Sequence, residues 1–234
     1  MENGVTYRIF PLGDSALTIE FGNQIDEAIN DKVLALTQHL QKLSLSGVIE
    51  VVPAYNTISL FYDLAVVSHV KKATTSFEWM KQLLEKEMQK NILSETVKGR
   101  SIRIPVCYGN EQGPDLATLA MKKGLSVEEV IQLHCSRTYR IYMLGFLPGF
   151  PYMGKVDERI SMPRKSQPEN VLAGSVGIAG IQTGIYPLPS PGGWSIIGRT
   201  PLKLFDSSNA DPVLLRMGDT VEFYPITKDE FESY

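Results

Sequence analysis

The sequence predicts an α+β protein made of a small N-terminal α+β domain and a C-terminal domain of mostly antiparallel β structure, a barrel or a sandwich. Two patterns carry this prediction. In the first 90 residues, pairs of alternating segments are twice followed by apolar residues at helical spacing. Residues 142–206 hold more than half of the chain's 19 Gly and 14 Pro, punctuated by aromatic and β-branched residues. Such a stretch is typical of short strands joined by tight turns.

The N-terminal elements begin with a predicted hairpin. Residues 4–10 and 15–21 alternate apolar and polar side chains and flank the turn sequence Pro-Leu-Gly-Asp. Apolar residues from Ile29 to Leu43 then recur every three or four positions, which predicts one face of a helix.

A second set of elements follows the first helix. Residues 48–52 and 57–62 predict another strand pair, and apolar residues from Val70 to Met88 predict a second helix. Because strand–strand–helix occurs twice, we expect an internal pseudo-repeat with two helices on one face of a sheet.

A polar stretch from Lys86 to Arg100 separates the two halves, and we place a linker at residues 91–99 between domains 1–90 and 100–234. The second domain opens with a predicted strand at residues 102–107 and two short helices. The later helix begins with a capping box at Ser126–Glu129. Strands and turns follow from Thr138, and residues 219–224 form a last alternating strand.

Bulk composition narrows the function classes. The net charge is −3 and no Lys/Arg-rich run occurs, so nothing suggests nucleic acid binding. No apolar run approaches the ~18 residues of a membrane-spanning helix. The two cysteines, Cys107 and Cys135, match no metal or redox spacing. We therefore expect a cytoplasmic protein with buried, reduced thiols, no metal site and no membrane partner.

No self-contained catalytic site is predicted. We expect His39, on the polar side of the first helix, and His69, at the start of the second, to be solvated. His134 and Cys135 are helix neighbours and point about 100° apart, which argues against a dyad. Ser175 lacks the Gly-x-Ser-x-Gly order of a nucleophile elbow.

The glycine-rich stretch also lacks a phosphate loop and a dinucleotide fingerprint. Its glycines are more typical of bulges and turns in a barrel. We therefore expect no intrinsic cofactor; if ATP is used, a partner should supply most of the phosphate cradle.

Arg164 and Arg199 are the best candidates for polar binding residues. Residues 161–205 contain one acid, Glu169, against four basic residues. A local cationic surface suits a carboxylate or phosphate, which Arg can grip with two hydrogen bonds. For Arg199 the alternative is a structural role, with hydrogen bonds to turn carbonyls around Pro191–Gly193.

Aromatic residues between the glycines could face solvent or fill the barrel. We expect Trp194 to plug the barrel and leave Tyr186 open between plug and exposed anchor. Four residues cannot all point inward along one strand, so some should form an apolar interface patch: Phe146, Leu147, Phe150 and Tyr152.

Three long motifs in this stretch resemble the family of the 5-oxoprolinase B subunit and allophanate hydrolase subunit 1. They are GFLPGFPYMG (145–154), GSVGIAGIQTGIYP (174–187) and SPGGWSIIGRTPLKLFD (190–206). The resemblance extends back through residues 104–109, 113–116 and 124–134, and more loosely into the N-terminal third. The chain departs from the pattern at Glu169 and Leu172, where the family has Arg and Pro.

The resemblance implies a cyclophilin-like β-barrel for the C-terminal domain. It implies a subunit, inactive alone, of an ATP-dependent complex with subunits A and C that opens 5-oxoproline to glutamate. Four residues in and around the motifs are expected to bind substrate or partner: Arg164, Gln182, Tyr186 and Arg199.

Other functions remain open. A member of this family inhibits autophosphorylation of a sporulation histidine kinase, so this chain could have that role as well, or could be purely regulatory. An allophanate hydrolase or carboxyltransferase-type subunit is another alternative. A prolyl isomerase is disfavoured because fold alone does not imply function.

Overall fold

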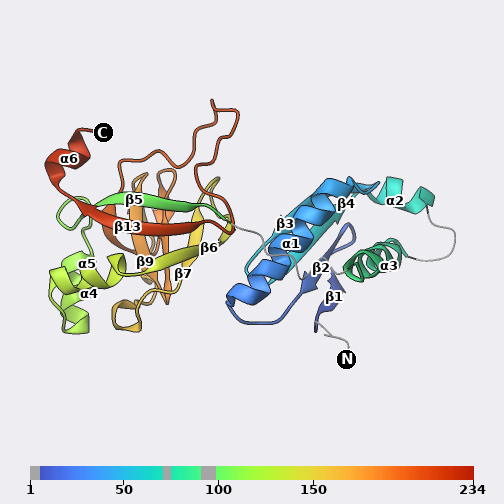
Figure 1. Ribbon diagram of the computed structural model, residues 1–234, viewed down its shortest axis with the longest axis horizontal. Helices are drawn as coiled ribbons and strands as arrows, with labels where there is room; N and C mark the ends of the chain where they lie inside the picture. Colours follow the sequence, from blue (N-terminus) through green and yellow to red (C-terminus); the bar gives the residue numbers. More distant parts are fainter. Residues whose placement is uncertain (1–5, 71–74, 91–98) are drawn as a thin grey trace. The chain divides into compact units, whose positions relative to one another are not determined.

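A computed structural model of the 234-residue chain describes residues 6–70, 75–90 and 99–234. The chain divides into two compact units, residues 1–97 and 98–234 (Figure 1). Apart from Gly99, the predicted linker at 91–99 lies outside the described residues, so its position stays a prediction. Within the described part, no helix is long and apolar enough to cross a membrane.

The N-terminal unit is one antiparallel sheet with helices. Its four strands lie in the order β1-β2-β4-β3. The elements are β1 (Arg8–Pro11), β2 (Ala16–Glu20), α1 (Glu27–Leu43), β3 (Val48–Pro53), β4 (Thr57–Tyr62), α2 (Leu64–Val70) and α3 (Ser76–Met88). The predicted hairpin, first helix and second strand pair are confirmed. Alternate β4 residues, Ile58, Leu60 and Tyr62, are buried, as expected for a half-buried strand.

The predicted helix from Val70 to Met88 is confirmed only over α3, Ser76–Met88: Val70 belongs to another helix, and residues 71–74 lie outside the described part of the chain. Val70 ends α2, and Thr75 caps a new helix, α3, by accepting a hydrogen bond from the Glu78 backbone at 3.1 Å. His69 therefore lies near the end of a helix, not at its start. Since two helices follow the second strand pair, the predicted internal repeat is not confirmed.

His39 is not solvated as predicted. Its Nε2 lies 2.8 Å from the Glu87 carboxylate on α3, and Glu87 is only 6% exposed. Hydrogen bonds from Lys90 and His39 lower the pKa of Glu87, although burial opposes this. The polar side of α1 therefore meets α3, a tertiary contact that periodicity within one helix cannot reveal.

The C-terminal unit is a closed seven-stranded barrel in the order β10-β7-β6-β13-β5-β12-β9, with a separate two-stranded β8-β11 sheet. Its elements are β5 (Ser101–Tyr108), α4 (Leu116–Lys123), α5 (Val127–Cys135), β6 (Thr138–Leu144), β7 (Pro151–Gly154), the 3₁₀ helix η2 (Glu158–Ile160), β8 (Glu169–Val171), β9 (Ser175–Ala179), β10 (Gln182–Ile185), β11 (Ser190–Gly192), β12 (Ser195–Arg199), β13 (Thr220–Ile226) and α6 (Lys228–Glu232).

This architecture confirms the predicted opening strand, two short helices, β-rich remainder and last strand. The capping box is present, with Ser126 and Glu129 exchanging hydrogen bonds at the start of α5. Of the two predicted forms, barrel and sandwich, the chain adopts the barrel. Its ladder is antiparallel except for β5 and β13, which run parallel along Ser101–Cys107.

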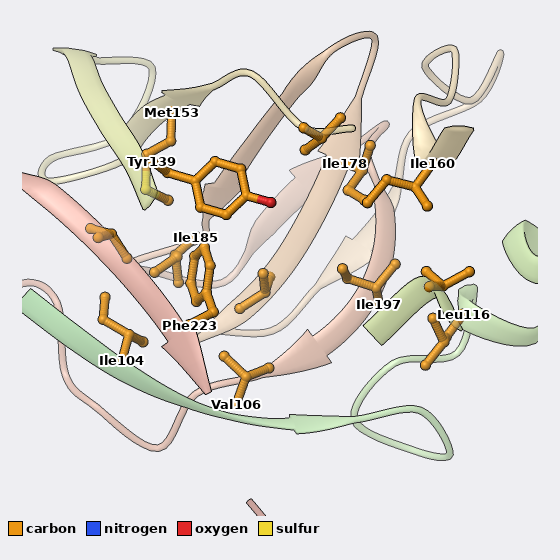
Figure 2. Close-up of a cluster of buried hydrophobic side chains, with 14 of the residues drawn as sticks. Ile104, Val106, Leu116, Tyr139, Met153, Ile160, Ile178, Ile185, Ile197 and Phe223 are labelled. Carbon is orange, nitrogen blue, oxygen red and sulfur yellow. The ribbon is translucent and has the colours of Figure 1, made fainter. Parts of the chain in front are cut away.

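The barrel interior is filled by aliphatic side chains from all sides. Figure 2 shows Ile104 and Val106 of β5 facing the same cluster as Ile178, Ile197 and Phe223. Each of the four aliphatic residues has no exposed surface, so the interior is a packed core with no channel.

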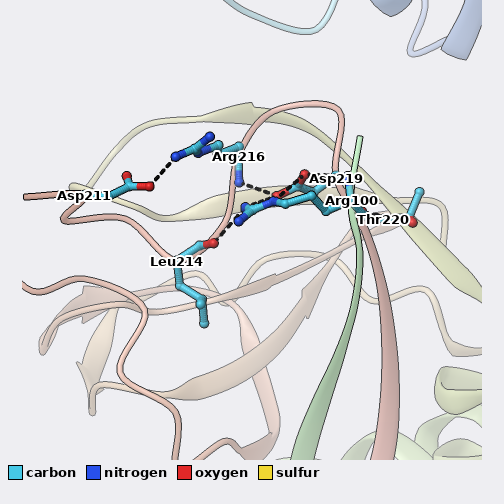
Figure 3. A network of polar contacts seen from close by, with 6 residues as sticks. All are labelled: Arg100, Asp211, Leu214, Arg216, Asp219 and Thr220. Atoms are coloured by element: carbon cyan, nitrogen blue, oxygen red, sulfur yellow. Dashed lines mark hydrogen bonds and ion pairs between the residues drawn. The ribbon is translucent and has the colours of Figure 1, made fainter. Parts of the chain in front are cut away.

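The carboxylate of Asp219 is buried between the starts of two paired strands, β5 and β13. Asp219, 2% exposed, accepts hydrogen bonds from the backbone and guanidinium of Arg100 and from the backbone of Arg216 (Figure 3). Burial opposes ionisation of Asp219, but these hydrogen bonds outweigh it and lower the pKa. These hydrogen bonds hold together the starts of β5 and β13, whose parallel pairing is part of the closed barrel.

Candidate functional site

An aromatic pocket opens on the barrel unit between the loop before β7, the loop before β8 and the turn between β11 and β12. Its volume is about 280 Å³. It is lined by Phe146, Phe150, Tyr152, Arg164, Lys165, Ser166, Pro168, Tyr186, Pro191, Gly192, Gly193 and Trp194. The glycine- and proline-rich stretch of the sequence therefore builds its walls.

Five aromatic rings form the rigid wall of this pocket. Phe150 is central: its ring centroid lies 5.1 Å from Tyr186 at 84° and 5.4 Å from Trp194 at 82°. Tyr152 lies 4.8 Å from Phe150 on another side. The edge-to-face contacts of Phe150 with Tyr186 and Trp194 are favourable for aromatic pairs. Phe150, Tyr186 and Trp194 are each at most 5% exposed, so their positions are fixed by packing.

Gly192 leaves room for the Tyr186 ring in the pocket wall. A Cβ at Gly192 would lie 2.3 Å from the hydroxyl oxygen of Tyr186, so a larger residue would displace the ring. Burial raises the pKa of Tyr186, partly offset by a backbone hydrogen bond with Trp194. Tyr186 is therefore a neutral, hydrogen-bonded part of the wall.

Phe146 stands at the mouth of the pocket in a strained conformation. Its φ is +68°, and the Leu147 backbone donates to the Gly145 carbonyl at 2.8 Å, a tight three-residue turn. The ring is edge-on to Phe150 and Tyr186, yet Phe146 remains 62% exposed. Strain of this kind in a non-glycine residue tends to occur at functional sites.

Arg164 is the unpaired cation of the pocket. Within the described residues it makes no hydrogen bond or ion pair, and it is exposed. Its neighbour Lys165 instead contacts Asp115 at 2.8 Å and Glu169 at 2.6 Å. Burial opposes the charge of Lys165, but the two carboxylates outweigh it and raise the pKa. Arg164 is thus left available for an anionic ligand.

A second, polar hollow of about 530 Å³ adjoins the aromatic pocket and shares Arg164, Lys165 and Ser166 with it. Its other lining residues come from α4, the loop before β8 and the start of β12: Asp115, Thr118, Leu119, Lys122, Met162, Pro163, Gln167, Glu169 and Ser195. Arg164 therefore stands between an aromatic and a polar compartment.

Of the four predicted binding residues, only Arg164 and Tyr186 line this pocket. Arg199 lines neither hollow; its Nε donates to the Ala173 carbonyl at 2.7 Å, and its guanidinium lies over the Phe231 ring at 5.8 Å. This is the structural role considered above, with Ala173 in place of the Pro191–Gly193 carbonyls as acceptor. Gln182 begins β10 and also lines neither hollow.

The predicted apolar patch is reduced to one exposed ring. Phe146 faces solvent, but Phe150 is 1% exposed and is wrong as a surface residue. Leu147 and Tyr152 are half-buried against the cluster around Phe150. Trp194 is buried as predicted, although it belongs to the pocket wall and not to the barrel interior.

A buried hydrogen-bond chain explains why His134 is not a base. Thr183 donates to the Gly177 carbonyl at 3.1 Å, so its oxygen accepts from His134 Nε2 at 3.0 Å. His134 Nδ1 then accepts from the Tyr108 hydroxyl at 2.8 Å. Burial lowers the pKa of His134 to about 3, so it is neutral.

The hydrogen bonds around Tyr108 fit the prediction that His134 and Cys135 do not form a catalytic dyad. The Tyr108 hydroxyl lies between the two groups, 3.3 Å from the Cys135 sulfur. Burial raises the pKa of the Cys135 thiol, although the contact with Tyr108 opposes this. Cys107 is buried as expected, but Cys135 is only half-buried.

Two residues of the site, Lys165 and Asp115, were not predicted from the sequence. Lys165 and Asp115 are 50 positions apart, and the contact depends on the loop before β8 folding back, where Lys165 donates its backbone N–H to Gly193 at 2.7 Å. The signal available was the Gly-Gly pair before Trp194, which marks a close backbone approach.

Residues 7–215 match the family described as the carboxyltransferase domain, subdomain C and D. This chain belongs to that family. The 5-oxoprolinase B subunit of Bacillus subtilis (strain 168) is 45% identical over 233 residues, which cover 98% of this chain and 97% of that protein. The resemblance inferred from the motifs is confirmed.

Solved structures place this carboxyltransferase-family fold inside longer chains. The crystal structure of TTHA0988 matches with a TM-score of 0.77 and 37% identity, covering 90% of this chain and 40% of that one. The K. lactis urea amidolyase matches at a TM-score of 0.75 and 19% identity, covering 97% of this chain and 15% of that one. The second likeness shows the fold alone.

Proposed function

We propose that this chain is the B subunit of an ATP-dependent 5-oxoprolinase and that its aromatic pocket binds 5-oxoproline. Subunits A and C would be its partners, and ATP would be consumed by the assembled complex. Support comes from a relative of nearly the same length that carries the subunit name, and from the longer TTHA0988 chain, of which this unit matches a part.

The observation that carries the proposal is Arg164, unpaired among the described residues, at an aromatic-walled pocket. 5-Oxoproline is a small, nearly flat five-membered lactam with one carboxylate. A guanidinium can hold that carboxylate with two hydrogen bonds. The exposed ring of Phe146 and the half-buried ring of Tyr152 offer apolar surface to the lactam ring. Phe150 and Trp194 are packed behind them. A pocket of about 280 Å³ is in keeping with so small a ligand.

The chemistry of ring opening would be completed by partners. Among the described residues, the best candidate base, His134, is buried, neutral and hydrogen-bonded on both ring nitrogens. No phosphate loop occurs in the sequence. A subunit that positions the lactam and leaves the catalytic base and the phosphate loop to a companion accounts for both features.

Tryptophan fluorescence tests the pocket directly. The chain has two tryptophans, so Trp79→Phe leaves Trp194 in the pocket wall as the only reporter. We expect titration with 5-oxoproline to change the Trp194 emission saturably. Arg164→Gln should weaken binding ~10-fold or more, because a charge-assisted contact is worth ~1.5–3 kcal/mol.

Lys203→Gln provides the matched control, because Lys203 is also cationic but pairs with Asp206 and lines neither hollow. Its affinity for 5-oxoproline should stay at the wild-type value. If Arg164→Gln binds as tightly as Lys203→Gln, the pocket is not the 5-oxoproline site.

Binding of a sporulation histidine kinase is a second candidate, favoured by the exposed ring of Phe146. An aromatic residue at the rim of a pocket is a common anchor for a protein partner. Phe146→Ser should then weaken inhibition of kinase autophosphorylation. An unchanged inhibition curve would remove this surface from that role.

A further inference from the structure

The polar hollow contains binding groups that a 5-oxoproline molecule in the aromatic pocket does not use. We infer that this hollow is a subsite for a phosphate group. The inference goes beyond the proposed function and does not rest on it, because its distinctive residues, Lys122 and Ser195, do not line the aromatic pocket.

Two cations of the hollow have no ion pair among the described residues: Lys122, which 5-oxoproline in the aromatic pocket does not reach, and Arg164, which both hollows share and whose five N–H donors can serve more than one anion. The carboxylates of Asp115 and Glu169 are both within 2.8 Å of Lys165. Asp115 is further occupied by the Ile196 backbone, which donates to its Oδ2 at 2.6 Å. The excess charge is therefore positive.

Ser195 supplies an independent indication of a ligand. It is only 4% exposed, yet its hydroxyl makes no hydrogen bond within the described part of the chain. The residue is buried, but its hydroxyl oxygen keeps some accessible surface, so water or a ligand can bond to it from the hollow. Because Ser195 lines the hollow, its free hydroxyl is available there. Thr118 and Ser166 add two more hydroxyls around the same space.

The combination favours phosphate over a carboxylate or a metal ion. A phosphate has three acceptor oxygens and a charge near −2, which matches two separate cations and several hydroxyl donors. A carboxylate would satisfy Arg164 alone. A metal ion is disfavoured because both carboxylates already hold Lys165. The volume, about 530 Å³, also accommodates a group larger than phosphate alone.

The choice of probe distinguishes the two possible sources of the phosphate group, a nucleotide and a free or small-molecule phosphate. Isothermal titration calorimetry at low salt would use inorganic phosphate, then ADP and ATP, with chloride at the same ionic strength as the blank. Tighter binding of a nucleotide than of phosphate would identify a nucleotide as the source. Equal affinity would identify a free or small-molecule phosphate.

Lys122→Gln and Lys123→Gln form a matched pair, since the lysines are adjacent and only Lys122 lines the hollow. We expect saturable binding, weakened ~10-fold by Lys122→Gln and several-fold by Ser195→Ala, with Lys123→Gln within twofold of wild type. Melting temperatures of all three variants verify that they are folded.

Two results would overturn the subsite. One is the absence of saturable phosphate binding up to about 10 mM, where even a weak specific site fills. The other is an equal loss in Lys122→Gln and Lys123→Gln, which would indicate only general surface charge. Binding of 5-oxoproline by Lys122→Gln should be unchanged, so failure here leaves the aromatic pocket to its own test.

Discussion

At the scale of single residues, Arg164 and Arg199 differ in what their guanidinium groups contact. Both lie in a stretch with a single acid, so the sequence alone makes both of them candidates for binding an anion. Arg199 lies at the end of β12 and donates to a backbone carbonyl, whereas Arg164 lies in a loop and makes no such contact within the described residues. Backbone geometry that arises only on folding separates the two.

Phe146 gives a prediction about strain and binding. At φ +68°, Gly is unstrained and Ala is not, so Phe146→Gly should be more stable than Phe146→Ala by about 1 kcal/mol. Both variants lose the ring and should bind 5-oxoproline equally weakly. Chemical denaturation and Trp194 fluorescence measure the two effects. An alanine variant as stable as the glycine variant would show that the backbone is unstrained.

His134 gives a prediction about pH. Its pKa is about 3 in the folded chain, below the value of about 6.5 expected when unfolded. The unfolded chain therefore binds a proton first, and the stability from neutral His134 is full above pH ~6.5 and lost between pH ~6.5 and 3.

His134→Gln removes this titration while keeping an amide that can donate and accept. The variant should be less stable at pH 7, but its free energy of unfolding should fall less steeply with acid over that range. Urea denaturation at a series of pH values measures the difference between the curves. Parallel curves for the two proteins would mean that folding does not change the pKa of His134.

At the scale of elements, the strands that wall the aromatic pocket depend on contacts made outside it. Arg199 on β12 holds the carbonyl of Ala173, just before β9, and packs on Phe231 of α6. The β8–β11 arm and Lys165 fix the opposite wall. The pocket is thus supported by residues that never meet a ligand in it.

Arg199→Ala should therefore reduce stability and leave pocket chemistry intact. Loss of one hydrogen bond to a carbonyl and a cation–π contact should cost about 1–3 kcal/mol. Affinity for 5-oxoproline, measured under conditions where the variant is folded, should stay within twofold of wild type. A variant with wild-type melting temperature and much weaker binding would place Arg199 in the site after all.

Local patterns predicted the elements well where the signal lies within one segment. The hairpins, α1, the capping box of α5 and the β-rich second half are examples. The sequence did not reveal the break between α2 and α3, because the spacing of apolar residues continues across it. Nor could it reveal the pairing of His39 with Glu87, since that depends on how two helices pack.

For the candidate site, the sequence predicted which region of the chain forms it, but not which of its side chains are buried and which face solvent. Aromatic residues alternating with Gly and Pro do not indicate which ring faces solvent. Phe150, one of four residues of which some were expected at an interface, is buried in the wall, whereas Arg164 and Tyr186, each expected to bind a ligand or partner, line the same pocket. Long-range contacts such as Lys165 with Asp115 decide these questions, and they have no local signature.

At the scale of the whole molecule, the proposed role is that of one component of a larger enzyme. One relative of nearly the same length is named as a subunit, and the longer TTHA0988 chain, 37% identical, contains the same fold. Among the described residues, Arg164 lines the aromatic pocket, whereas His134 is hydrogen-bonded to Thr183 and does not line it. We therefore expect the purified chain alone to show no ATPase and no 5-oxoprolinase activity.

The most direct test is 5-oxoproline-dependent ATP hydrolysis by the chain reconstituted with subunits A and C, with each component omitted in turn. We predict turnover only when all three are present, and a raised KM for 5-oxoproline with Arg164→Gln but not with Lys203→Gln. Substantial turnover by the isolated chain, or full turnover without it, would contradict the proposed role.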